Sequence, residues 1–154
     1  MYVNYSRKLL MSKCEWIEMT DVRDLGMSLI DKYPNQFGHI LIDRMKLIGL
    51  TNAKPPREGA KIWNFISIQT PVNELIGIDI VGLVHFDSWS NLDDKARALI
   101  IASMLSCIEW KDRLTVKGYD LHDSKNMIIN FGVDYENNPE SPDILNTNYN
   151  WRSV

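Results

Sequence analysis

Ser103 and Cys107 lie four residues apart on a largely apolar stretch of the chain. On a helix, residues at this spacing share one face. It is also the spacing at which a helix presents two histidines to one zinc ion, with a glutamate after the first as general base. Met104 occupies the place of that glutamate. Because serine is a poor zinc ligand and methionine accepts no proton, the stretch has the spacing of a zinc site without its chemistry.

The helix that positions these residues is predicted over residues 91–110. Asn91 or Ser90 can cap its start, and two aspartates in the first turn suit the positive end of the helix dipole. The apolar residues recur at the period of a helix rather than that of a strand. We therefore expect an amphipathic helix with Ser103 and Cys107 on its buried face.

The flanking segments predict an α+β domain. Periodicity and breaker residues indicate a helix at 20–33, strands at 39–50, 60–69 and 77–86, a turn at 70–75, a polar connection at 111–118 that can form a hairpin, and a helix at 120–131. These elements predict a single domain over residues 1–132, with a small mixed or antiparallel sheet packed by about three helices. Residues 133–154, which contain five asparagines and two prolines, are predicted as a C-terminal extended tail.

The composition excludes several classes of protein. The 154 residues are 45% hydrophobic and 24% charged, with a formal net charge of −3. The mild negative charge argues against a nucleic-acid partner. The longest apolar run, residues 76–86, is too short for a membrane span. Two cysteines and no apolar N-terminal leader predict a reducing cytoplasm.

One set of residues, considered together, has the order and spacing of a known family. In chain order the set is Asp79-Ile80-Val81, Trp89, Leu92, Arg97-Ala98-Leu99, Leu105, Ile108-Glu109, Tyr119-Asp120-Leu121-His122 and Gly132. The set resembles the zincin-like metallopeptidase family found mainly in phages and mobile elements, over residues 20–132. The resemblance implies a zincin-like fold. It places Ser103 and Cys107 at the two histidine positions, Met104 at the general base and Tyr119 at the third ligand.

With those four positions replaced, the resemblance implies a pseudoenzyme with no metal and no cofactor. A phage or mobile-element protein of this kind would act in the host cytoplasm. We expect it to bind another protein, of host or phage, and to inhibit or modulate a host complex such as a defence system. A peptidase-type fold suits this role, because it offers a cleft beside an edge strand to an extended peptide.

The expected partner contacts are aromatic and acidic residues of the second half of the chain: Trp110, Tyr149, Trp151, Asp134, Glu136 and Glu140. Tyrosine and tryptophan are common anchors of protein interfaces. The alternative is that Trp110 and Trp151 pack the tail onto the body of the domain.

A second hypothesis is a metal-dependent peptidase with an atypical ligand set, Cys107, Tyr119 and His122. A thiolate and an imidazole can both bind zinc. This set has no carboxylate base, however, and a buried cysteine on a helix is more often a small apolar filler. His122, with Asp120 and Asp123 near it in the sequence, fits a solvated surface histidine better than a metal ligand.

Overall fold

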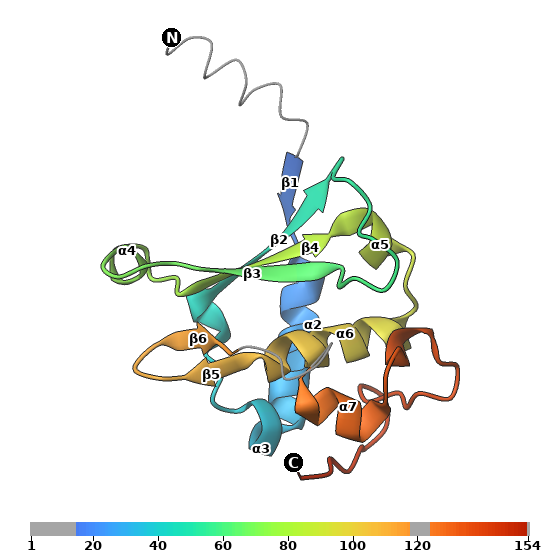
Figure 1. Cartoon of the computed structure of the whole chain (residues 1–154). Helices are drawn as coiled ribbons and strands as arrows, with labels where there is room; N and C mark the ends of the chain where they lie inside the picture. The colour runs from blue at the N-terminus through green and yellow to red at the C-terminus, as the bar shows by residue number, and fades with distance from the viewer. Residues whose placement is uncertain (1–14, 118–123, 154) are drawn as a thin grey trace.

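The computed structural model describes residues 15–117 and 124–153, which form one sheet layer and one helical layer (Figure 1). The sheet strands are β1 (Glu15–Glu18), β2 (Met45–Thr51), β3 (Trp63–Ser67) and β4 (Ile80–His85). They lie in the order β1-β2-β4-β3. β2 and β4 are parallel, and the other two pairs are antiparallel. The predicted α+β class with a small mixed sheet is confirmed.

Within the described residues there are six α-helices, where about three were expected: α2 (Thr20–Lys32), α3 (Pro34–Phe37), α4 (Val72–Ile76), α5 (Phe86–Ser90), α6 (Asp94–Ser106) and α7 (Lys125–Phe131). The longest three are the helices that periodicity predicted. The additional three, α3, α4 and α5, have four or five residues each. Such short helices are too brief to show an apolar period, which is why the sequence did not reveal them.

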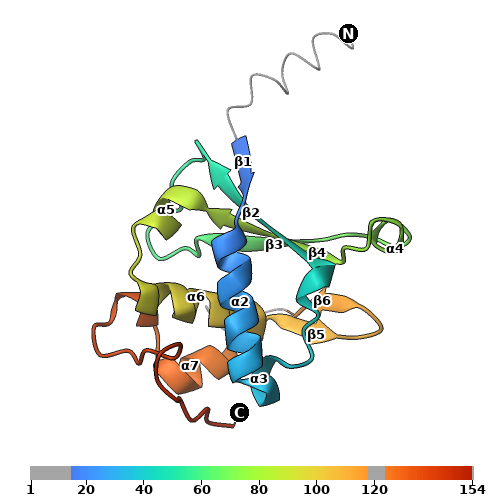
Figure 2. The same ribbon diagram turned by 180° about the vertical axis from the view of Figure 1, so that it is seen from behind.

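The helices α2, α3, α6 and α7 lie on the same side of the sheet, as the two opposite views show (Figures 1 and 2). Alternate residues of β4, namely Ile80, Gly82 and Val84, are buried toward this layer. A Cβ atom at Gly82 would lie 2.7 Å from Leu47 Cδ2 and 3.4 Å from Met104 Cε. The missing side chain of Gly82 therefore leaves room for the Leu47 side chain of the neighbouring strand β2.

The helix α6 differs from its prediction at both ends. It starts at Asp94, and the carboxylate of Asp93 caps it by accepting a hydrogen bond from the Ala96 N–H at 2.8 Å. The expected caps, Asn91 and Ser90, are wrong because α5 and its end occupy those positions. The helix ends at Ser106.

The residues that follow α6 form a β-hairpin. Its strands are β5 (Ile108–Trp110) and β6 (Leu114–Val116), and they pair antiparallel. The hairpin expected in the polar connection is therefore present, but it takes in residues 108–110, which had been assigned to the helix. Asp112, at the tip, has a positive φ of 63°, a conformation that aspartate tolerates in tight turns.

α6 is buried on all sides, and not along one face as expected. All residues from Ala98 to Ser106 are buried. α2 and the sheet cover one side, while α7 and the 3-10 helix η2 (Tyr135–Asn137) lie against another. This arrangement makes α6 the centre of the core.

The segment 133–153, which the sequence predicted as an extended tail, contains the short helix η2 and packs onto the body. Tyr135 and Ile144 are buried in the common core. The Lys32 ammonium donates hydrogen bonds to the carbonyls of Leu145 and Thr147, at 2.6 and 2.5 Å. In the described part of the chain, no helix is long and apolar enough to cross a membrane.

Candidate functional site

The predicted zinc-ligand positions on α6 lie inside the core. Ser103 and Cys107 are fully buried, and Met104 is almost so. The Cys107 thiol donates a hydrogen bond to the Ser103 carbonyl at 3.2 Å. Met104 instead reaches toward the sheet, near Gly82. Tyr119, the fourth position, lies outside the described residues.

Residues 15–117 and 124–153 contain no group of three or more His, Cys, Asp or Glu side chains that could hold a metal ion. His39 bonds the Ile108 carbonyl at 2.8 Å, and His85 bonds the Ser88 hydroxyl at 2.7 Å, so both rings have structural partners. The atypical ligand set includes Tyr119 and His122, both outside the described residues, and it stays a prediction.

Asp79 is a fully buried carboxylate at the start of β4, and four hydrogen bonds converge on it. Arg44 donates two of them, from Nε at 2.9 Å and from Nη2 at 2.7 Å. The Asn73 amide donates at 2.9 Å and the Leu114 backbone N–H at 3.0 Å. The Arg44 hydrogen bonds, joined by those of Asn73 and Leu114, hold the pKa of Asp79 well below its usual range, against the opposing effect of burial.

These bonds make Asp79 a brace between three segments that are distant in the sequence. Arg44 precedes β2, Asn73 belongs to α4, and Leu114 begins β6. Arg113 adds a hydrogen bond to the Asp79 carbonyl at 2.8 Å. A carboxylate that accepts four hydrogen bonds is poorly suited to act as a general base. Its role here is to fix α4 and the hairpin relative to the sheet.

α4 and the hairpin project from the same end of the molecule in both views (Figures 1 and 2). We call the exposed apolar residues of α4, the hairpin and the adjoining end of β3 the end surface: Ile66, Val72, Leu75, Ile76, Trp110 and Val116. Leu75 is 80% exposed and Trp110 46%. Large exposed apolar side chains that gather on one part of a protein are typical of a protein-binding site.

The other expected partner contacts fall into two groups. Tyr149 and Trp151 are half-buried and belong to an aromatic cluster. The Trp151 ring meets Tyr33, Phe37, Phe131 and Tyr149 edge-on, with centroid distances of 5.7, 5.4, 5.2 and 5.4 Å. Tyr149 and Trp151 therefore pack the segment onto the body. The alternative that the sequence left open named Trp110 and Trp151, and it describes Trp151 but not Trp110, which is exposed. Asp134, Glu136 and Glu140 lie at the surface, away from the end surface.

Of the end surface, sequence reasoning identified only Trp110. The residues of α4 were missed because Pro71 and Asn73 are typical of a turn. One signal was present: three large apolar residues, Val72, Leu75 and Ile76, occur within five positions of that supposed turn.

Comparison of the chain with protein-family models, curated proteins and solved structures gives no match. Its function is therefore inferred from its own residues and their arrangement.

Proposed function

We propose that this protein is a non-catalytic, metallopeptidase-like protein that works by binding another protein. A phage or mobile-element origin would make a host complex, such as a defence system, the expected target, and inhibition or modulation the expected effect. The supporting observation is the end surface, six exposed apolar side chains on elements that Asp79 holds in place.

The exposed apolar side chains favour association. Burying a leucine or a residue of similar size contributes about 1.5–3 kcal/mol relative to leaving it in water. Leu75 and Ile76 expose most of their surface, so the isolated chain gains little of this free energy of burial from them. A partner that buries these two side chains gains that free energy.

The Asp79 brace lowers the cost of association. Binding normally loses free energy when loops and side chains become ordered at an interface. Asn73, the second residue of α4, is buried and bonded to Asp79, so the backbone that carries Leu75 is already held. The end surface is therefore preorganised for a partner.

The zincin-like part of the proposal rests on the resemblance of residues 20–132. The burial of Ser103, Met104 and Cys107 is compatible with it, because a scaffold that binds by surface complementarity needs no metal in α6. An exposed active-site face on α6 would have favoured an enzyme instead.

The test is a pull-down from native host lysate with three baits, followed by mass spectrometry and by titration of the purified partner. The baits are the wild-type chain, Leu75→Asp on the end surface and Ile129→Asp on the exposed side of α7. We expect wild type and Ile129→Asp to retain one stoichiometric partner, and Leu75→Asp to bind it at least ~10-fold more weakly.

Equal binding by Leu75→Asp and Ile129→Asp would show that the end surface is not the interface. The absence of any stoichiometric partner for the wild-type chain in its native host would contradict a protein-binding function.

A further inference from the structure

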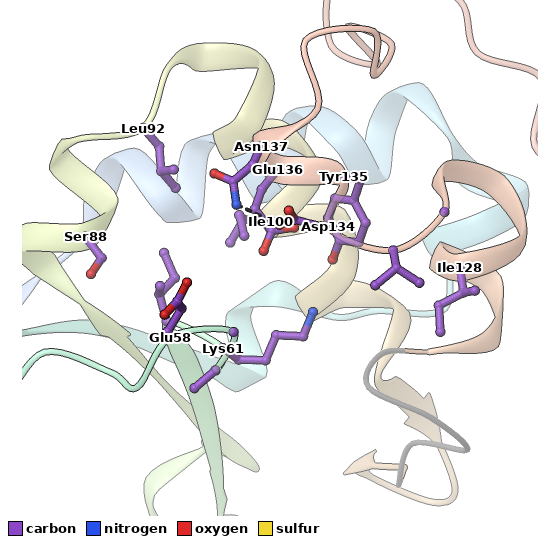
Figure 3. A pocket seen from close by; sticks show the side chains of 15 residues that line it. Glu58, Lys61, Ser88, Leu92, Ile100, Ile128, Asp134, Tyr135, Glu136 and Asn137 are labelled. Carbon is purple, nitrogen blue, oxygen red and sulfur yellow. Dashed lines mark hydrogen bonds between the residues drawn. The ribbon is translucent and has the colours of Figure 1, made fainter.

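A cleft of about 520 Å³ lies at the other end of the molecule from α4, between the loop before β3, the α5–α6 junction and the segment from α7 to η2 (Figure 3). Its inner lining is largely apolar. Leu92 and Ile100 come from the α6 side, and Tyr135 comes from η2. This volume is within the range of small-molecule and side-chain binding sites.

The charged residues of the cleft are mostly acidic. Among the described lining residues there are three carboxylates, Glu58, Asp134 and Glu136, against one ammonium, Lys61. Figure 3 shows Glu58 on one wall and Asp134 and Glu136 on the opposite wall, with their carboxylates facing the space between them. The field inside the cleft therefore favours a cation.

The Tyr135 ring already has a cationic partner from the chain itself. The Lys61 ammonium lies 5.4 Å from its centroid, so this ring already stacks against a positive charge within the cleft wall. Because Lys61 covers the ring, the groups that remain for a ligand are the carboxylates and the apolar lining beside them, and these suit a cation that carries an alkyl part.

We propose that this cleft binds an ammonium or guanidinium group carried on a short alkyl chain. The alkyl part packs on Leu92 and Ile100, and the charged head lies between Glu58 and the carboxylates of Asp134 and Glu136. Two sources carry this chemistry: a lysine or arginine side chain of another polypeptide, or a free polyamine. The cleft is distant from the end surface, so this inference does not depend on the function proposed above.

The test is a backbone-amide NMR titration of the whole chain with three probes. The probes are N-acetyl-lysine methylamide, 1,5-diaminopentane and, as the neutral control, 1,5-pentanediol. We expect both amines to give saturable shifts at Lys61, Ile100 and Tyr135, and the diol to give none. Tighter binding of the lysine derivative indicates a polypeptide side chain, and tighter binding of the diamine indicates a free polyamine.

Charge-neutral variants test which groups hold the cation. Glu58→Gln and Glu136→Gln should each weaken binding of the amines by about two- to fivefold, the range expected for ion pairs near a surface. Glu15→Gln, an equally exposed acid on β1, should leave the affinity unchanged. Both cleft variants replace exposed or half-buried side chains, so the fold should persist, and the amide spectrum reports whether it does.

Raising the ionic strength should weaken the binding of both amines, since salt screens charges near a surface. Three results would overturn the proposal: no saturable shift with either amine, equal shifts with the diol, or unchanged affinity in the double variant Glu58→Gln, Glu136→Gln.

Discussion

The variant Asp79→Ala removes a buried carboxylate that accepts four hydrogen bonds. It leaves the Arg44 guanidinium, the Asn73 amide and the Leu114 N–H without their acceptor. Removing one member of a fully buried ion pair costs about 3–5 kcal/mol, and because the Arg44 side chain is 30% exposed, the cost here lies toward the lower end of that range. We expect the free energy of unfolding to fall by this amount, a large part of the stability of a domain this size.

The chain offers a matched control, because it contains a second pair between arginine and aspartate. Asp43 pairs with Arg23, but its side chain is 86% exposed, whereas that of Asp79 is 0% exposed. Asp43→Ala should cost no more than about 1 kcal/mol. Urea unfolding followed by tryptophan fluorescence measures both variants on one scale.

Two further measurements make the prediction specific to the brace. Hydrogen exchange at the Leu114 amide should accelerate in Asp79→Ala more than exchange in α2, because β6 loses its bond to the carboxylate. The pH dependence has a defined sign. The pKa of Asp79 is depressed in the folded chain, so its stabilisation is complete above the pKa of about 3.9 that an unfolded aspartate has, and it is lost as the pH falls below that value.

The difference in stability between wild type and Asp79→Ala should therefore be constant from pH 7 to about pH 5 and shrink in more acidic solution. Equal costs for Asp79→Ala and Asp43→Ala would refute the reasoning. So would a difference that grows as the pH falls.

Three further predictions concern the core. Trp151→Ala should lower the free energy of unfolding by about 3 kcal/mol in urea titrations, because four aromatic rings lose their shared contact, whereas a neutral effect would mean that the segment does not hold the body. Gly82→Ala should lower the free energy of unfolding by about 1–3 kcal/mol, because its Cβ would lie 2.7 Å from Leu47 Cδ2. If that clash is the cause, the double variant Gly82→Ala, Leu47→Ala should recover part of the lost free energy. Protein purified without a histidine tag should contain no stoichiometric zinc by elemental analysis, and a chelator should leave its Tm unchanged; stoichiometric zinc that is lost in Cys107→Ala would favour the peptidase hypothesis instead.

Local signals in the sequence predicted most of the long elements. Pro34 ends the first helix: α2 stops at Lys32, and the proline begins the short α3. Gly132 follows the last residue of α7 with a positive φ of 77°, a conformation that favours glycine. The stretch rich in Ile and Val before His85 forms β4, which lies next to β2 in the interior of the sheet. These features depend on neighbouring residues, so one sequence is enough to predict them.

The features that the sequence did not predict depend on residues far away along the chain. α4 looks like a turn until Asp79, which bonds Asn73, is itself held by Arg44 and Leu114, each 35 residues away along the chain. α6 looks amphipathic until η2 and α7 cover its second side. The end surface was missed for the same reason, because it becomes a surface only when α4 and the hairpin are brought together. The metallopeptidase resemblance remains a proposal that a homologous structure can test.

The hydrogen bonds between α2 and residues 144–147 also bear on how fast the chain folds and unfolds. Tyr33 donates to the Ile144 carbonyl and Lys32 to that of Thr147, across 111 and 115 residues of sequence. Closing a loop of that length costs about 4 kcal/mol of chain entropy before any contact repays it. These bonds are therefore expected to form after the folding barrier. Mutations that remove these bonds should mainly raise the unfolding rate and leave the folding rate almost unchanged. The bonds therefore set the lifetime of the folded state.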